Sequence, residues 1–289
     1  MLIQPVLSDD ALLSSIRSSG PRDGNFRLWW LGQSGFLIQW EGRHLLLDPY
    51  LSDSLTKKYL TTDKPHVRMT ERAIDPARLN FIDVVTSSHN HTDHLDAETL
   101  LPVLAANPKT ALVVPEANRA FVADRLRMDP ALPLGLSDGL SIDVAGFHIA
   151  GVPSAHDEIE RDDLGRSKFL GYVVRFGPWT IYHSGDTLRY PEMAGILRPF
   201  HIDVALLPIN GAAPERRVAG NLNGPQAAQL AHDIGAGLVI PCHYEMFEFN
   251  TAPPDEFTAE CARLAQPCRV LRCGEPWSSR EVSTWEAAQ

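Results

Sequence analysis

A dense histidine motif is the feature that most restricts how this chain can fold. Residues 81–86 are apolar and predict a buried strand, and a segment with helical spacing begins at Leu95. Four side chains that can bind metal ions lie between the two: His89, His91, Asp93 and His94. Alternate residues of an extended backbone point the same way, so His89 and His91 can face one site. The motif therefore predicts a metal centre where a strand ends and a helix begins.

A surface loop with exposed histidines is the simpler alternative. It does not account for the density of the motif, which holds three of the chain's 11 histidines. A metal centre also needs ligands from distant parts of the chain, and suitable side chains follow three later apolar segments. They are His156 after 147–152, Asp186 after 179–183 and His243 after 238–241. Each stands where a predicted strand leaves the core, which favours the metal centre.

The apolar segments predict two similar halves, each with strand hairpins followed by strand–helix units. In the first half we expect strands at 26–31, 35–40, 44–47, 81–86 and 111–114, and helices at 95–106 and 116–128. In the second half we expect strands at 141–144, 147–152, 169–176, 179–183, 204–208 and 238–241, and helices at 223–235 and 254–264. This order of elements favours an α/β fold in which two sheets pack together with helices outside.

The chain contains no segment that reads as a linker between domains. We therefore expect residues 1–289 to form a single domain, with residues 1–25 as an N-terminal arm or short helix. Residues 52–80 are polar and charged and contain few periodic apolar residues. They are expected to form a long excursion that could cover a site.

Charge and composition narrow the range of partners. The formal net charge is −10, the opposite sign to that of a general nucleic-acid binder, so nucleic acid is not expected as a partner. The chain contains no apolar run of about 18 residues, so no membrane span is predicted. The first 20 residues lack the basic start and apolar run of a secretory signal. The four cysteines show no Cys-x-x-Cys spacing, which favours reduced thiols and a cytoplasmic location.

The order of the motifs resembles that of the metallo-β-lactamase fold hydrolases. The chain has His-x-His-x-Asp-His at 89–94, a single histidine at 156, Gly-Asp-Thr at 185–187 and a late histidine at 243. The resemblance covers about residues 29–277 and implies a four-layer αββα sandwich, with two mixed β-sheets and helices on the outer faces. Segments 29–35, 182–187, 202–206 and 239–243 resemble the L-ascorbate-6-phosphate lactonase branch. The N-acyl phosphatidylethanolamine phospholipase D branch shares parts of the same pattern.

The resemblance implies a centre for two divalent metal ions. The first ion would be held by His89, His91 and His156. The second ion would be held by Asp93, His94 and His243, and both ions would be bridged by Asp186. Imidazole and carboxylate ligands accept zinc, manganese or iron, so the sequence does not choose among these metals. The two ions would share a hydroxide that attacks a carbonyl or phosphoryl centre, with Asp93 and Asp186 as catalytic carboxylates that steer its proton.

Two further residues are candidates for orienting the ligands. Asp48 ends the strand 44–47 and would accept a hydrogen bond from a ligand histidine; a simple turn aspartate is the alternative. His183 lies beside the Gly-Asp turn, where a structural core histidine is the alternative. Five other histidines belong to no cluster and are interpreted as structural: His44, His66, His148, His201 and His232.

Substrate contacts are expected from loops around the centre. The loop 210–224 would lie near the metals, and its basic residues Arg216 and Arg217 could bind an anionic substrate; exposed loop charges are the alternative. Tyr244 follows a candidate ligand and is a further candidate for substrate binding. The excursion 52–80 is the other candidate for setting specificity.

The predicted function is that of a metal-dependent hydrolase for a small, anionic substrate. The lactonase resemblance favours an L-ascorbate-6-phosphate-like or other small lactone. Three alternatives stand beside it: a phosphodiesterase of the N-acyl phosphatidylethanolamine phospholipase D type, an RNA-processing nuclease and a non-catalytic metal-binding module. The negative net charge disfavours the nuclease, and the complete ligand set disfavours the module. The sequence leaves the oligomeric state open, with a homo-oligomer as one option.

Overall fold

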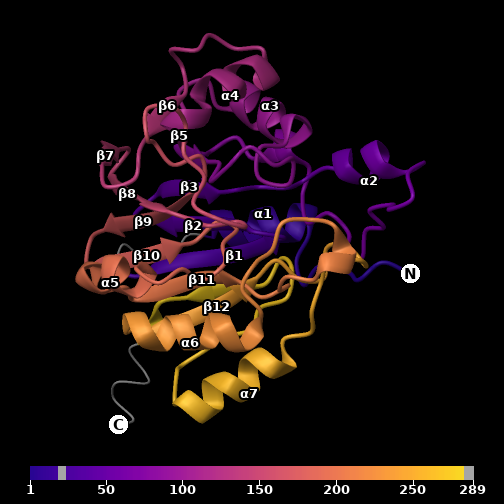
Figure 1. Cartoon of the computed structure of the whole chain (residues 1–289). Helices are drawn as coiled ribbons and strands as arrows, with labels where there is room; N and C mark the ends of the chain where they lie inside the picture. The colour runs from indigo at the N-terminus through magenta and orange to yellow at the C-terminus, as the bar shows by residue number, and fades with distance from the viewer. Residues whose placement is uncertain (19–23, 283–289) are drawn as a thin grey trace.

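Two β-sheets pack face to face, and helices cover both outer faces (Figure 1). The computed structural model describes residues 1–18 and 24–282. The arrangement confirms the predicted four-layer αββα sandwich. Each half of the chain supplies most of one sheet, as the repeated order of hairpins and strand–helix units predicted.

The first sheet has seven strands in the order β13-β1-β2-β3-β4-β5-β6. They are β13 (Pro276–Ser278), β1 (Phe26–Gly32), β2 (Gly35–Trp40), β3 (Arg43–Leu47), β4 (Val84–Thr86), β5 (Ala111–Pro115) and β6 (Leu134–Leu136). β1, β2 and β3 are antiparallel, whereas β3 to β6 run parallel. The sequence did not predict β6 and β13, because three residues are too few to show a period.

The second sheet has six strands in the order β12-β11-β10-β9-β8-β7. They are β12 (Leu238–Cys242), β11 (Val204–Pro208), β10 (Trp179–His183), β9 (Leu170–Phe176), β8 (Phe147–Pro153) and β7 (Ser141–Val144). β10, β11 and β12 run parallel, and β9 is antiparallel to both β8 and β10. The carboxyl ends of β8, β10 and β12 therefore meet at one edge of the sheet.

Both faces of the first sheet are buried, which explains why its strands are apolar at nearly every position. In β1, Leu28 and Trp30 point into the layer between the sheets. The intervening Trp29 and the following Leu31 belong to a second core beneath the helices. Because successive side chains of a strand point to opposite faces, β1 contributes residues to two separate hydrophobic cores.

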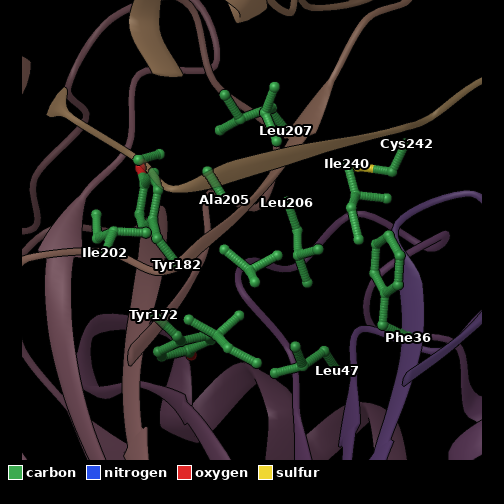
Figure 2. Close-up of a cluster of buried hydrophobic side chains, with 14 of the residues drawn as sticks. Phe36, Leu47, Tyr172, Tyr182, Ile202, Ala205, Leu206, Leu207, Ile240 and Cys242 are labelled. Carbon is green, nitrogen blue, oxygen red and sulfur yellow. The ribbon is translucent and has the colours of Figure 1, made fainter. Parts of the chain in front are cut away.

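The same alternation is visible along β11 in the second sheet (Figure 2). Leu206 points toward Phe36 and Leu47 of the first sheet, whereas Ala205 and Leu207 point to the opposite side. All five side chains are fully buried. β11 therefore packs against the other sheet on one face and against the covering helices on the other.

Six α-helices form most of the two outer layers. The first sheet is covered by α1 (Asp9–Arg17), α3 (Ala97–Ala106) and α4 (Arg119–Leu126), and the second by α5 (Met193–Leu197), α6 (Gly224–Ile234) and α7 (Asp255–Leu264). The predicted N-terminal arm 1–25 contains α1, whose Leu12, Leu13 and Ile16 are buried in the core. Residues 19–23 of that arm lie outside the described residues.

Two predicted elements begin three residues later in the structure than the sequence predicted. The expected strand 81–86 is shortened to β4 (Val84–Thr86): Ile82 N donates to Asn107 Oδ1 at 2.9 Å and not to a neighbouring strand, whereas Asp83 still bonds to His44 and Ala111. The expected helix 116–128 begins as a short 3₁₀ helix, Glu116–Asn118, before α4. Arg127 ends α4 with a left-handed backbone, at φ 51°.

The excursion 52–80 is tied to distant parts of the chain. It contains α2 (Ser54–Tyr59) and a 3₁₀ helix, Pro76–Arg78. Met69 N donates to Met246 O at 2.8 Å, and Glu248 N donates to Val67 O at 3.0 Å. On its other side Ile3 N donates to Met69 O at 2.8 Å. These bonds hold the excursion against the segment that follows β12.

The structure also bears on the expectations about membrane spans and about the cysteines. Among residues 1–18 and 24–282, none of the helices combines the length and the hydropathy needed to cross a membrane. The four cysteines are free thiols in the structure: Cys242, Cys261, Cys268 and Cys273.

The cap of α6 gives a stability prediction. The Asn223 side chain accepts from Gln226 N at 2.9 Å, and the Gln226 side chain accepts from Asn223 N at 3.0 Å. Asn223→Ala removes one half of this capping box and leaves a helix-terminal N–H without its acceptor. We expect the free energy of unfolding to fall by about 1 kcal/mol, measured by chemical denaturation. An unchanged denaturation midpoint would show that the cap is not needed.

Candidate metal centre

The candidate ligands meet at the edge where parallel strands of both sheets end. The motif 89–94 follows β4, and His156 follows β8. Asp186 follows β10, and His243 follows β12. Loops at the carboxyl ends of parallel strands share one side of the fold, so residues far apart in sequence come together there.

The side chains form two groups with the spacing of metal ligands. One group comprises His89, His91 and His156. The other comprises Asp93, His94, Asp186 and His243. Within each group the ligand atoms all lie within 4.8 Å of one another. The two groups coincide with the sets that the sequence predicts for the first and second ions.

Asp186 connects the two groups. Its Oδ2 lies 3.1 Å from His243 Nε2 and 3.5 Å from His156 Nε2. Its Oδ1 lies 3.2 Å from His94 Nε2. The carboxylate is buried, and it contacts histidines of both groups at once. This is the position that a bridging carboxylate requires.

Three of the histidines are oriented by hydrogen bonds at Nδ1. His94 Nδ1 lies 2.8 Å from Asp48 Oδ2, and His156 Nδ1 lies 2.8 Å from Gly220 O. His89 Nδ1 lies 3.0 Å from Ser88 Oγ. Such bonds fix the ring orientation and leave Nε2 for a metal ion.

The free imidazole nitrogens test whether the cluster fits a cation. The Nε2 atom of His89 is buried and has no hydrogen-bond partner, and the buried Nε2 of His94 has the Asp186 carboxylate beside it at 3.2 Å. Buried polar atoms without partners are costly, whereas a cation shared with Asp186 would satisfy both. The donor set of imidazoles and carboxylates therefore fits a divalent metal ion.

Asp48 is placed to orient His94. It follows β3 and is fully buried, and its carboxylate also accepts from Ser88 N at 3.0 Å and from Thr86 Oγ1 at 2.9 Å. Burial alone would raise the pKa of Asp48, but the hydrogen bond from His94 and nearby charges lower it below its ordinary value. Asp48 is thus an ionised acceptor with several fixed donors.

The protonation of the second group is set by its two carboxylates. Burial opposes charge on His94 and His243, but Asp186 and Asp93 raise the pKa of His94 well above its ordinary value and that of His243 to about 9. Burial likewise opposes charge on Asp186, yet His243 and His94 hold its pKa well below its ordinary value. In the absence of metal, two imidazolium groups therefore balance the buried carboxylates.

His89 behaves differently from the histidines of the second group. Burial lowers its pKa well below the ordinary value, and His94 and His91 add to the effect. Its ring is therefore neutral near neutral pH and can offer a lone pair without losing a proton.

Gln33 is a site residue that the sequence analysis missed. Its Nε2 donates to Asp93 Oδ2 at 2.7 Å and lies 3.0 Å from His243 Nε2. Its backbone carbonyl accepts from His243 N at 2.9 Å and from Trp30 Nε1 at 2.9 Å. The turn between β1 and β2 thus reaches the second group of ligands. The only sequence signal was the segment 29–35, which entered the resemblance without any role for Gln33.

His183 supports the same turn. Its Nε2 lies 2.9 Å from Ser34 O, and its ring packs against the edge of Phe36. His183 is fully enclosed and belongs to neither ligand group. Its contacts are those of a buried histidine that holds the backbone beneath the centre.

The loop 210–224 reaches the cavity through Val218 and Ala219, but the predicted substrate residues make other contacts. Arg216 donates to the carbonyls of Asn210 and Thr251, so its guanidinium holds the loop together. Arg217 forms an exposed ion pair with Asp63 at 2.9 Å. Tyr244 is buried, stacks on Trp30 with ring centroids 4.5 Å apart, and donates to Leu271 O. None of the three predicted residues lines the cavity.

The cavity over the ligands has a volume of about 300 Å³. Its floor includes His91, Asp93, His156, Asp186 and His243. The excursion 52–80 contributes Leu55, Lys58, Tyr59 and His66 to the walls, and the segment after β12 contributes Phe247, Phe249 and Asn250. His66 was interpreted as structural from sequence, but it lines the cavity because the excursion folds back over the ligands.

Arg125 is another residue that sequence patterns did not single out. It lies on α4, lines the cavity, and donates to Asn90 O at 2.7 Å and Leu95 O at 3.2 Å. These carbonyls lie within and directly after the histidine motif. Arg125 therefore holds the backbone of the motif while part of its side chain faces the cavity.

Comparisons with known proteins agree with this geometry. The family model of the Beta-lactamase superfamily domain matches residues 27–243. The UPF0173 metal-dependent hydrolase of Opitutus terrae is 30% identical over 86% of this chain and 98% of its own length. Igni18, a metallo hydrolase from Ignicoccus hospitalis, has a similar structure with a TM-score of 0.64, 24% identity, and coverage of 88% of this chain and 98% of that chain. A possible metal-dependent hydrolase from Veillonella parvula has a TM-score of 0.70 at 14% identity, covering 87% and 98% of the two chains.

The fold and the two ligand groups define a metallo-β-lactamase-type protein, and the chain belongs to the Beta-lactamase superfamily. Its relatives of similar length are named metal-dependent hydrolases. The protein is accordingly a metal-dependent hydrolase of this superfamily.

The contacts of Gln33 predict an effect on metal affinity. Gln33→Leu removes the donor to Asp93, so one ligand of the second group loses its orientation. We expect metal affinity to fall by roughly 10–100-fold, measured by competition with a chromogenic chelator. Gln39→Leu is the matched control, because buried Gln39 also contacts a histidine, His44, at 3.0 Å, but lies outside both ligand groups. Equal affinity in the two variants would contradict the role of Gln33.

The raised pKa of His243 predicts how metal binding depends on pH. A cation at Nε2 must displace the proton, and the pKa of His243 in the metal-free protein is about 9. Metal affinity is therefore expected to rise with pH through about 9, and His94, whose pKa is also raised, extends this rise because it too must lose a proton. The stabilisation of the metal-free fold by this imidazolium is present below the unfolded-state pKa and is lost as pH rises through the folded value. Chelator competition across the neutral and alkaline range tests the first effect, and a flat profile would contradict it.

Proposed function

We propose that this hydrolase binds two divalent metal ions and opens a small lactone or a related ester. The observation that carries the proposal is the Asp186 carboxylate, which contacts histidines of both ligand groups within 3.5 Å. A single ion would leave one group of imidazoles without a cation. Zinc and manganese both suit this donor set, and iron is the third option.

The metals and the protein have separate roles in the proposed reaction. Divalent ions held by the two groups would act as Lewis acids and lower the pKa of water to near neutrality. Asp93 and Asp186 lie on the cavity floor, where their ionised carboxylates can accept a hydrogen bond from the attacking water and orient its proton. Asp48 and Gln33 orient the ligands His94 and Asp93 through hydrogen bonds. Neither Asp48 nor Gln33 lines the cavity, so both act on the side of the ligands that faces away from the substrate. The enclosing walls limit the access of bulk water.

A phosphodiesterase is the second candidate, and the cations of the cavity favour it. Lys58 and Arg125 line the walls and could attract a phosphate group. The lactonase hypothesis expected Arg216 or Arg217 to bind an anionic substrate. In the structure Arg216 donates to Thr251 O and Arg217 pairs with Asp63. Any anionic part of a substrate would therefore depend on Lys58, Arg125 and the metals. The predicted cytoplasmic location and the homo-oligomer stay predictions.

A hydrolase screen of the metal-loaded protein tests the proposed function. The protein is reconstituted with zinc, manganese or iron and offered simple lactones, alkyl esters and bis(4-nitrophenyl) phosphate. We expect about two metal equivalents per chain and faster turnover of lactones than of the phosphodiester. Turnover of the phosphodiester alone would favour the second candidate. Less than half an equivalent after reconstitution would contradict the two-ion centre.

The role of Asp186 can be tested apart from the identity of the substrate. Asp186→Ala removes contacts to both ligand groups, so we expect the loss of both tightly bound ions and of hydrolysis. His183→Ala is the comparison, because this buried histidine contacts Ser34 O but belongs to neither ligand group. Metal analysis after dialysis distinguishes the two variants. Retention of two ions by Asp186→Ala would disprove the bridging role.

A further inference from the structure

Four aromatic rings form a continuous wall on one side of the cavity. We call Tyr59, His66, Phe247 and Phe249 the aromatic wall; all four line the cavity. Tyr59 stacks on His66 with ring centroids 4.1 Å apart and planes inclined by 15°. His66 also packs edge-on against Phe249 at 4.5 Å and against Phe247 at 5.3 Å. The rings support one another, so the wall has a defined shape.

The residues of the aromatic wall are not candidate metal ligands. Tyr59 and His66 come from the excursion, whereas Phe247 and Phe249 follow β12. The backbone bonds between Glu248 and Val67 and between Met69 and Met246 bring the two segments together. Phe247 also packs on Tyr50, and both belong to a small apolar cluster with Leu55 and Met246. The structure thus fixes aromatic side chains directly beside a polar metal centre.

The wall is uncharged near neutral pH. Burial lowers the pKa of His66 below its ordinary value, so its ring is neutral within the stack. Lys58 and Lys64 lie near the rings, with their ammonium groups 5.1 Å from the centre of Tyr59 and 5.2 Å from the centre of Phe249. The phenyl rings of Phe247 and Phe249 offer no hydrogen-bonding atoms to a polar substituent. An alkyl or aryl group would instead remove apolar surface from water.

We propose that the aromatic wall binds an uncharged alkyl or aryl group of the substrate while the ester or lactone carbonyl lies at the metal centre. This inference rests on the proposed function and names its substrate class: a small lactone or ester with an apolar substituent. The cavity of about 300 Å³ lies at the lower end of the range for ligand sites. It therefore suits one ring with a short substituent, and long acyl chains exceed it.

A series of δ-lactones with growing alkyl substituents tests the proposal. δ-Valerolactone has no substituent, whereas δ-octalactone and δ-decalactone carry propyl and pentyl groups. Hydrolysis by the metal-loaded protein is followed by the proton released. We expect kcat/KM to rise roughly 4-fold for each methylene that the wall covers, until the cavity is filled. Acetate, butyrate and hexanoate, which carry alkyl chains of increasing length, are titrated in parallel by calorimetry and should bind more tightly as the chain grows.

Two variants test whether the aromatic wall causes the preference for longer alkyl substituents. Phe249→Ala should lower the preference for δ-octalactone over δ-valerolactone by roughly 10-fold. Phe200→Ala is the matched control: Phe200 is also partly buried, but it packs near Arg175 and does not line the cavity. Metal content should stay unchanged in both variants.

The outcomes separate this proposal from the proposed function. If no lactone is hydrolysed but the longer carboxylates bind more tightly and Phe249→Ala abolishes that difference, the proposed function fails and the aromatic wall is supported. If lactones are hydrolysed at rates independent of the substituent, the proposed function stands and the wall proposal is overturned. An unchanged preference in Phe249→Ala overturns it as well.

Discussion

The buried Asp186 carboxylate is the constraint on which the centre depends. A carboxylate can be buried only where positive charge or donors compensate it. His94 and His243 supply this compensation as imidazolium groups in the metal-free protein, and both keep raised pKa values because of Asp186 and Asp93. Cations bound as proposed would take the place of these protons at the same ligand atoms. The fold thus gathers the candidate ligands and balances their charge in the metal-free protein.

The surrounding fold holds this centre through hydrogen bonds from three directions. Asp48 at the end of β3 orients His94, and Gly220 O orients His156. The turn between β1 and β2 contributes Gln33, which contacts Asp93 and also binds the backbone of His243. These supports come from separate loops, so the ligand geometry depends on correct packing of the two sheets. Mutations in the core between the two sheets are thus expected to disturb the ligand geometry, because they shift the loops that make these hydrogen bonds.

Sequence patterns predicted most of the fold, and the failures have local causes. Strands such as β2, β7 and β10 have the predicted bounds because their apolar residues are flanked by clear turns. β4 is shorter than predicted, and before it Ile82 N donates to the Asn107 side chain and not to a neighbouring strand. The ligand groups were predictable because strand ends and metal-binding side chains coincide. Arg216 and Arg217 were misplaced relative to the cavity, because sequence shows the charge of a loop residue but not its partners.

The sequence by itself indicated the layered fold and the candidate ligands, since both follow from local signals: apolar periodicity and histidine and aspartate residues at strand ends. The division of these ligands into two sets came from the family resemblance. Only the tertiary structure decided what lies above and below the ligands. The excursion 52–80 looked like a polar loop, yet it brings Tyr59 and His66 over the centre because backbone bonds join it to the segment after β12. Gln33 likewise carries no local signal of its role. Such contacts join residues far apart in the chain, and no periodic pattern records which distant segments will meet.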